Sequence, residues 1–323
     1  MTIRKFQIEN DLDRLESYLR KRYFENHNAL SWLPERLHDL LYRVSAQESN
    51  EGREKSADYI FLWEEDGEIV ACILPDGENI YVSIKEGFEQ LFAAMLAFSE
   101  KNCRPLFPRT ESGAVKFWVA ISDGLPYAQK TLIDSGYGKY EEEEFMNCVY
   151  PQNAEASADL PHGFRLLYGE EYPDEENKWS ALRMGFHPDH ESPDYRAGMN
   201  PYLERKKSSL YPGSFECIVA DDNAAENNNV CAYCFVYVDK QTKTALIEPV
   251  STREKYRRRG FGTAMMHRAV QRCKELGVEK CYVDSFGRRK DFYNAAGFFT
   301  ENSIGFWYKT LCKDLSEKDG QES

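Results

Sequence analysis

The sequence contains no long apolar run and no excess of positive charge. No stretch approaches the roughly 18 apolar residues that a membrane-spanning helix needs, and the amino-terminal segment lacks the apolar core of a signal peptide. Lysine and arginine total 41 against 54 aspartates and glutamates, a formal net charge of -13. Because phosphate backbones and anionic lipids attract an excess of Lys and Arg, this balance argues against nucleic acid or membrane as a partner. We therefore expect a cytoplasmic protein.

A disulfide framework and a metal-binding cluster are also missing. The nine cysteines are scattered through a long chain, which is typical of reduced, buried thiols. Cys231 and Cys234 form a CxxC pair inside the apolar run NVCAYCFVYV, so we interpret them as small core side chains. His187 and His190 lie in a more open loop, but no second cluster of ligands accompanies them. We expect no metal.

The chain is long enough for two domains and has a polar break between them. At 323 residues a single domain would be unusually large, and the segment PQNAEASADLP is poor in apolar residues. We predict a first domain at 1–150, a linker at 151–161, a second domain at 162–315 and a disordered tail at 316–323.

Both halves show the same order of predicted elements. In the second half, helices at 174–184 and 201–210 precede strands at 215–222, 230–239 and 244–252, a helix ended by Gly277, a strand at 280–285, a short helix at 289–296 and a strand at 303–311. The first half has helices at 11–23 and 34–44, a hairpin at 59–74, a strand at 79–84, a helix at 84–102, a strand at 115–121, a helix at 126–135 and a strand at 144–150, with a solvated run EEEE at 141–144. This order predicts a duplicated domain.

The segment RRRGFG, residues 257–262, joins a predicted strand to a predicted helix. A helix that begins there presents free backbone N–H groups at the positive end of its dipole. Gly260 and Gly262 would let phosphate oxygens approach those amides, and the arginines add charge and donors. The spacing is neither that of a Walker loop nor that of the dinucleotide-binding GxGxxG. We interpret the segment as a pyrophosphate-sized anion site, with a solvated basic helix start as the alternative.

Two motifs and the order of elements carry a resemblance to a known family. RRRGFG fits the pattern Gln/Arg-x-x-Gly-x-Gly/Ala, and DFYNAAGF resembles FYxxxGF; both are motifs of the GNAT superfamily of N-acetyltransferases. The resemblance covers the second half of the chain. It implies an α/β protein of two tandem GNAT folds, each a mixed, mostly antiparallel sheet flanked by helices. It also implies that the fourth and fifth strands of the catalytic sheet splay apart.

The resemblance further implies acetyl-CoA as a co-substrate. The backbone of Val250, Ser251 and Thr252 would pair with the pantetheine arm. The residues that would wrap the pyrophosphate are Arg257, Arg258, Arg259, Gly260, Phe261, Gly262 and Thr263. Many relatives carry an asparagine that binds coenzyme A seven residues before the motif tyrosine. Here that position is Phe286, so Asn294 is the candidate substitute for this contact.

Tyr293 stands at the catalytic-acid position of the second motif and would protonate the leaving thiolate. An attacking amine must be neutral, and a carboxylate acting through water can supply the base. Glu248, just before the strand segment that would bind pantetheine, is the first candidate, and Asp284 on the neighbouring strand is the second. Simple packing of the tyrosine and a salt bridge of Glu248 at the surface are the alternative interpretations.

The first half departs from both motifs. Alignment of the strand and helix starts puts Ile84, Gly87 and Glu89 at the places of the motif arginine and glycines, and Leu132 at the place of Tyr293. A carboxylate about 5 Å from a phosphate charge would cost roughly 3 kcal/mol at an effective dielectric near 20. We therefore expect that the first domain does not bind acetyl-CoA.

The sequence defines the acceptor least well. The segments predicted to form its pocket, from residue 179 to 196 and after 199, carry aromatic residues beside acidic ones, which suits a small cationic amine. Helix packing and ordinary surface charge explain the same residues equally well, and a protein acceptor remains open, as does the oligomeric state. The hypothesis is direct N-acetyl transfer from acetyl-CoA to a primary amine. The alternative is a non-catalytic acetyl-CoA-binding sensor or assembly module.

Overall fold

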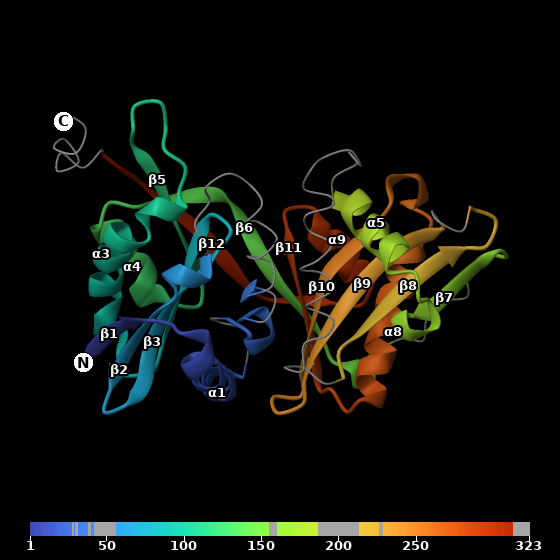
Figure 1. Ribbon diagram of the computed structural model, residues 1–323, viewed down its shortest axis with the longest axis horizontal. Coiled ribbons are helices and arrows are strands. Elements are labelled where there is room, and N and C mark those ends of the chain that lie inside the picture. Colours follow the sequence, from blue (N-terminus) through green and yellow to red (C-terminus); the bar gives the residue numbers. More distant parts are fainter. Residues whose placement is uncertain are drawn as a thin grey trace. The chain divides into compact units, whose positions relative to one another are not determined.

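The computed structural model describes residues 1–27, 29, 32–37, 40–41, 56–154, 160–186, 213–225 and 229–312 (Figure 1). The chain forms two compact units: Met1–Tyr18, Arg53–Glu143 and Ile304–Ser323 make the first, and Leu19–Gly52 and Glu144–Ser303 make the second. These units differ from the contiguous ranges 1–150 and 162–315 that the sequence predicts. No helix in the described part of the chain is long and apolar enough to cross a membrane.

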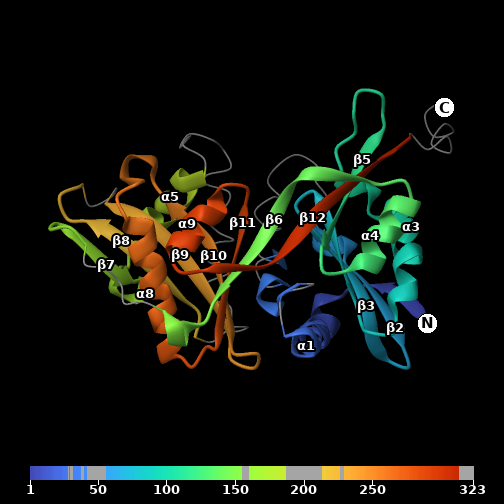
Figure 2. The same ribbon diagram turned by 180° about the vertical axis from the view of Figure 1, so that it is seen from behind.

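The second unit is built on a mixed sheet with the strand order β6-β11-β10-β9-β8-β7. Its strands are β7 (Phe164–Tyr168), β8 (Phe215–Asp221), β9 (Val230–Asp239), β10 (Thr244–Thr252), β11 (Lys280–Phe286) and the carboxyl-terminal part of β6 (Gly138–Val149). All neighbouring strands run antiparallel except β10 and β11. Helices α8 (Phe261–Glu275) and α9 (Arg289–Ala295) pack on one face of the sheet, and α5 (Glu175–Phe186) packs on the other (Figures 1 and 2).

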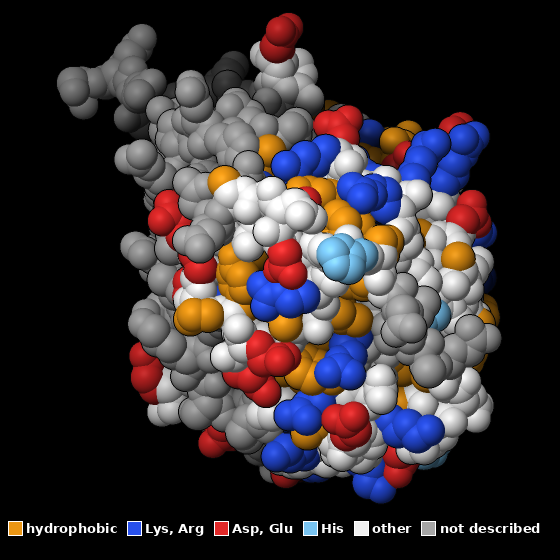
Figure 3. Space-filling view, turned by 90° about the vertical axis from the view of Figure 1, so that its right-hand side faces the viewer, with side chains coloured by type: hydrophobic (Ala, Val, Ile, Leu, Met, Phe, Trp, Pro, Cys, Tyr) orange, Lys and Arg blue, Asp and Glu red, His pale blue; other side chains and the backbone are white. Residues whose placement is uncertain are grey.

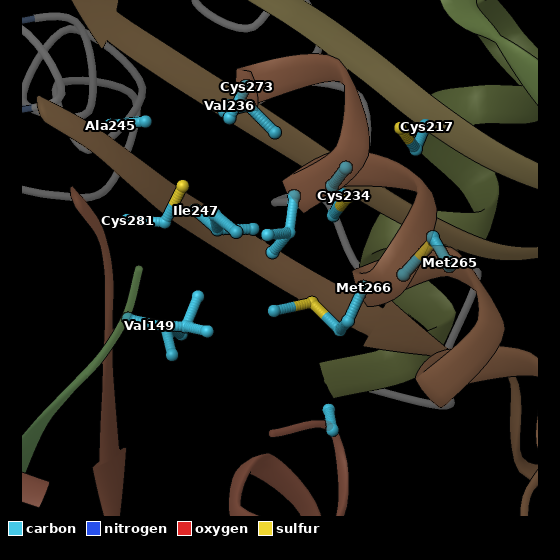
Figure 4. Close-up of a cluster of buried hydrophobic side chains, with 14 of the residues drawn as sticks. Val149, Cys217, Cys234, Val236, Ala245, Ile247, Met265, Met266, Cys273 and Cys281 are labelled. Atoms are coloured by element: carbon cyan, nitrogen blue, oxygen red, sulfur yellow. The ribbon is translucent and has the colours of Figure 1, made fainter. Parts of the chain in front are cut away.

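The central strand β9 shows why this sheet forms. Its side chains alternate between the two faces, and all ten of its residues are buried, as expected of a strand covered by helices on both sides. Cys234 and Val236 pack with Met265 and Met266 of α8, and Ile247 of β10 joins the same cluster (Figure 4). The CxxC cysteines are both fully buried in this cluster as free thiols, in agreement with their interpretation as core side chains.

Among the described residues, the edge strand β7 pairs with β8 alone. The face of the second unit that carries this edge mixes acidic, basic and hydrophobic side chains (Figure 3). Arg165 forms an ion pair with Asp222 at 2.6 Å, and Arg268 of α8 lies 4.5 Å from the ring centroid of Tyr168. Charged side chains at an edge discourage another strand from adding to the sheet.

The first unit repeats the pattern of the second. Its sheet has the order β1-β2-β3-β4-β5-β12, antiparallel except for the parallel pair β4–β5. Its elements are β1 (Thr2–Lys5), β2 (Phe61–Glu65), β3 (Glu68–Asp76), β4 (Asn79–Ile84), β5 (Val115–Ser122), part of β12 (Phe299–Leu311), and helices α3 (Phe92–Asn102) and α4 (Pro126–Asp134), with α1 (Ile8–Asn26) divided between the units. Short 3₁₀ helices cover Ser56–Tyr59, Glu89–Leu91, Arg104–Leu106, Pro151–Asn153, Gly169–Glu171 and Glu254–Tyr256.

Each half of the sequence gives its last strand to the sheet of the other unit. Residues 304–311 of β12 pair with β5, and residues 144–149 of β6 pair with β11. From the sequence, each of these strands was expected to belong to the domain of its own half. Alternating hydrophobicity identifies a strand but leaves its neighbour undefined, because pairing depends on contacts far away in the sequence.

Several local predictions differ from the structure. β6 begins at Gly138, so the EEEE run lies inside the strand, and the expectation that it is solvated is wrong for Glu144, which is 2% exposed. The helix predicted at 84–102 begins with a 3₁₀ turn and becomes α-helical at Phe92. Strands β1 and β7 were not predicted. The loop with His187 and His190, the helix predicted at 201–210 and the tail at 316–323 lie outside the described residues.

Candidate active site

Strands β10 and β11 separate partway along their length. They pair in parallel only from Thr244 opposite Lys280 to Leu246 opposite Tyr282. Beyond this point β11 continues against β6, while β10 continues against β9 up to Thr252 after an irregularity between Ile247 and Val250. Within the described residues, the edge of β10 that faces β11 therefore has no strand neighbour after Leu246. The splayed strands implied by the family resemblance are present.

A cavity of about 670 Å³ opens at this divergence. Its walls come from the end of α5, from β10, from the turn before α8 and the first turn of α8, and from the end of β11 and α9. The sequence-predicted site residues that line it are Glu248, Val250, Ser251, Thr252, Arg257, Arg258, Gly260, Phe261, Gly262, Thr263 and Tyr293. Arg259 and Asn294 are not among its lining residues. Asp284, the second candidate base, also lines the cavity.

The start of α8 presents backbone amides to the cavity. Gly260 is the N-cap residue with φ 80°, and Arg258 two residues earlier also has a positive φ of 59°. The first helical bond runs from the N–H of Ala264 to the carbonyl of Gly260, and no side chain caps the helix. The amides left free for a ligand by this helix start are those of Phe261, Gly262 and Thr263. Such a cluster at the positive end of a helix binds anions.

Gly262 is closely packed at the same place. A β-carbon on Gly262 would lie 3.0 Å from the Phe292 ring and 3.4 Å from the hydroxyl oxygen of Thr252. With any other residue at this position, the Phe292 ring would have to shift by a few tenths of an ångström.

Arg257 joins the end of β10 to the end of α5. Its guanidinium donates hydrogen bonds to the carbonyl of Thr252 at 3.0 Å and to that of Gly185 at 2.7 Å. Gly185 lies directly on β10, since a β-carbon there would stand 2.4 Å from the β-carbon of Ser251. Arg257 thus fixes a wall of the cavity in addition to lining it.

The other arginines differ in their roles. The guanidinium of Arg259 lies 4.9 Å from the ring centroids of both Phe164 and Phe261, so it stacks on aromatic rings and is not itself a lining residue of the cavity. Arg258 is exposed and lines the cavity. Arg289, on α9, also lines it. Arg289 was not among the predicted site residues, although its place one helical turn before Tyr293 puts both residues on one face of α9.

Tyr293 lies on α9 with 9% of its surface exposed. Burial and the nearby Glu248 carboxylate raise the pKa of the Tyr293 hydroxyl, and Arg289 acts in the opposite direction. A hydroxyl with a raised pKa keeps its proton near neutral pH, which a proton donor requires. The next residue, Asn294, is exposed and points in another direction, since consecutive helical residues do not share a face.

Both candidate bases contact Arg36. Its guanidinium, 4% exposed, lies 3.5 Å from the carboxylate of Glu248 and donates a hydrogen bond to Asp284. Glu144, on the neighbouring strand β6, lies 4.0 Å from the same guanidinium. Arg36 could not be identified from the sequence, because nothing in PERLHDL sets it apart from other polar helix residues and 248 positions separate it from Asp284.

The corresponding loop of the first unit is filled by its own side chain. Gly87 has φ 85°, close to the 80° of Gly260, but its N–H donates a hydrogen bond to the carboxylate of Glu89 at 3.0 Å. Leu132, at the place of Tyr293, is buried in the hydrophobic core of this unit. The positive φ of the glycine is retained, and an internal carboxylate accepts a hydrogen bond from its amide.

Comparison with known proteins adds independent support. Residues 176–301 match the model of the acetyltransferase (GNAT) family. The chain is similar to a GCN5-related N-acetyltransferase from Sphaerobacter thermophilus, at 14% identity over 84% of this chain and 91% of that chain with a TM-score of 0.59. It is also similar to a tandem GNAT protein from the clavulanic acid biosynthesis pathway, solved without AcCoA, at 13% identity over 84% and 94% with a TM-score of 0.54.

A GNAT-family acetyltransferase from Colwellia psychrerythraea gives 12% identity over 96% of this chain and 100% of that chain, with a TM-score of 0.54. No curated protein sequence matches the chain. At these identities the solved structures establish the fold, and the family model establishes the membership of the range that it matches. Since that range contains both the glycine turn before α8 and Tyr293, the second half of the chain carries a domain of the acetyltransferase (GNAT) family.

Proposed function

We propose that this protein transfers the acetyl group of acetyl-CoA to a primary amine of a small, cationic molecule by direct attack of the amine. One observation carries the proposal: a single cavity is lined by the free amides at the start of α8, by the unpaired edge of β10 and by Tyr293 and Glu248. Anion binding, extended-chain binding and proton transfer are the three tasks that acetyl transfer from coenzyme A requires.

The residues present fit acetyl-CoA. The amides of residues 261–263 and the Arg258 side chain would hold the pyrophosphate, and Arg289 adds a second exposed cation. The edge of β10 at residues 250–252 offers backbone groups to the amides of the pantetheine arm, as a strand offers them to another strand.

The proposed reaction needs one base and one acid. Glu248 accepts a proton from the ammonium form of the acceptor through water, because only the neutral amine has a lone pair. The amine nitrogen then bonds to the acetyl carbon, the carbon–sulfur bond breaks, and Tyr293 gives its proton to the leaving thiolate. The nitrogen loses its second proton as it becomes the amide, and this proton passes through water to the Tyr293 phenolate, while the proton on Glu248 is released to solvent. A backbone amide near Val250 would stabilise the charge on the carbonyl oxygen during attack.

The acceptor class is supported by the charges around Arg36. Within the described residues, the carboxylates of Glu144, Glu248 and Asp284 surround this one guanidinium. Excess negative charge favours a cationic acceptor over an anionic one. Of the aromatic residues considered for this pocket, Phe186 lines the cavity, whereas Trp179 is buried in the core. The acidic residues considered between 187 and 196 lie outside the described residues.

A two-step experiment tests the proposal. The melting temperature is first measured with and without acetyl-CoA, and thiol release is then followed with polyamines, aminoglycosides, amino acids and peptides as acceptors. We expect thermal stabilisation by acetyl-CoA and release with at least one cationic amine. Stabilisation without release on any amine would favour the sensor or assembly module, and absence of stabilisation would refute both functions.

A further inference from the structure

We propose that Arg36, which comes from the first half of the sequence, is a positioning residue for acetyl transfer: it holds Glu248 and Asp284 together as carboxylates at the place where the acceptor amine loses its proton. This inference rests on the function proposed above. It adds a residue that neither GNAT motif contains.

Because β10 and β11 diverge, an interaction other than strand pairing must set the distance between Glu248 and Asp284. Glu248 and Asp284 lie beyond the last paired residues of these two strands, so no ladder hydrogen bond between the strands sets the spacing of the two carboxylates. The same terminal nitrogen of Arg36, Nη2, contacts both: it lies 3.5 Å from Glu248 Oε2 and is hydrogen-bonded to Asp284 Oδ2. The guanidinium therefore bridges β10 and β11 beyond the residues at which their backbone pairing ends.

The helical stretch at 34–37 is itself anchored to β10. Glu35, fully buried, accepts a hydrogen bond of 2.5 Å from the hydroxyl of Thr244 at the start of that strand. Consecutive side chains thus contact β10 at Thr244 and at Glu248. Arg36 is not a lining residue of the cavity, so its contribution passes through the carboxylates and not through contact with the ligand.

Electrostatics predicts what the loss of Arg36 does. Glu144, Glu248 and Asp284 would lose a shared cation while remaining close together and largely buried. Like charges that are out of water take up a proton, because the charged forms repel one another. Within the described residues Tyr293 also faces this cluster: Glu248 raises its pKa, and Arg289 acts in the opposite direction. A protonated Glu248 can no longer accept the proton of the amine.

The first test needs no acceptor. The melting temperature of the full-length chain is measured from about pH 5.5 to about pH 8.5 for Arg36→Met, Arg36→Lys and the double variant Arg36→Met/Asp284→Asn. The carboxylates of Arg36→Met have raised pKa values in the folded state, so the variant loses stability as the pH rises. The double variant has one negative charge fewer in the cluster, so it loses less stability over the same pH range. Glu35, whose pKa is raised by burial to about 7, is present in both Arg36→Met and the double variant, so the difference between these two chains reports on the carboxylate cluster.

The second test uses the amine that gives the fastest thiol release in the acceptor panel. We expect Arg36→Met to lower kcat about 100-fold, to leave the KM for acetyl-CoA unchanged and to move the acid limb of kcat/KM to higher pH. Arg36→Lys should recover part of kcat, since lysine keeps the charge but lacks the planar fork. Arg20→Met, which removes an ion pair to Asp239 elsewhere in the second unit, is the matched control and should leave the pH profile unchanged.

The two tests separate the possible failures. Absence of turnover with every amine defeats the proposed function, while the stability measurement still decides whether Arg36 keeps the carboxylates charged together. An Arg36→Met chain whose melting temperature falls equally at all pH values would overturn the inference. The inference would also be overturned if the acid limb of kcat/KM in Arg36→Met lies at the same pH as in the natural chain. A loss of kcat no larger than that of Arg20→Met would overturn it as well. If Arg36→Met does not fold, the comparison of Arg36→Lys with the natural chain carries the first test, and its comparison with Arg20→Met carries the second.

Discussion

Replacing Tyr293 with phenylalanine removes one hydroxyl from the wall of the cavity and keeps the ring. The ring contacts Phe292 and Phe298 at centroid distances of 4.9 Å and 6.2 Å, and these contacts survive the change. The hydroxyl forms no hydrogen bond within the described residues, so we expect the stability of the fold to change by less than ~1 kcal/mol. Binding of acetyl-CoA should also persist, because the amides at the start of α8 are untouched.

The rate of acetyl transfer, in contrast to stability and acetyl-CoA binding, should fall strongly. Loss of a positioned general acid typically lowers the rate by about 10²–10⁴, or ~3–5 kcal/mol of activation free energy. The assay is thiol release at saturating acetyl-CoA, together with a calorimetric dissociation constant for acetyl-CoA. Because burial and Glu248 raise the pKa of Tyr293, the natural chain should show no loss of this acid at mildly alkaline pH.

Tyr282→Phe provides the control for this experiment. Tyr282 is a buried tyrosine on β11 that hydrogen-bonds Tyr23 and is not a lining residue of the cavity. Its replacement should lower stability by about 1 kcal/mol and leave kcat unchanged. Unchanged turnover in Tyr293→Phe, or an equal loss in the control, would refute the assignment of Tyr293 as the proton donor.

Four further predictions concern packing, binding and thiol chemistry. Gly185→Ala should lower the free energy of unfolding by about 1–3 kcal/mol through its clash with Ser251, and Ser251→Gly in the same chain should restore part of it in chemical denaturation. Gly262→Ala should weaken acetyl-CoA about tenfold in titration calorimetry, since Phe292 must move. Calorimetry should find one acetyl-CoA per chain, because a carboxylate fills the corresponding loop of the first unit. An aromatic disulfide reagent should modify one thiol per native chain, that of Cys312, because the other eight cysteines are buried, and all nine after unfolding.

Local structure could be predicted from the sequence where the hydrophobic pattern is strong. The strands at 79–84, 230–239 and 244–252 have the predicted bounds, and the Asp66-Gly67 hairpin turn is confirmed by positive φ values of 52° and 82°. The edge strands β1 and β7 were missed because they are short and only partly buried. The strand exchange could not be inferred, since no local pattern encodes a partner in the other half.

The site residues also divide into those that could be predicted from the sequence and those that could not. Residues joined by a motif, such as Gly260, Gly262 and Tyr293, could be found because the motif fixes their spacing. Arg36 and Glu144 could not, because ion pairs between distant segments leave no local signal, and a buried glutamate looks like any other member of an EEEE run.

The exchange of β6 and β12 makes the two halves of the chain interdependent. A cut within 151–161 would leave each fragment without the strand that borders its parallel pair, so neither should fold alone, whereas the fragments mixed together hold every strand. The exchanged β6 also brings Glu144 to Arg36. Under the proposed function, a first half that binds no acetyl-CoA would still supply the second half with a strand and a charge, and so could not be lost after duplication.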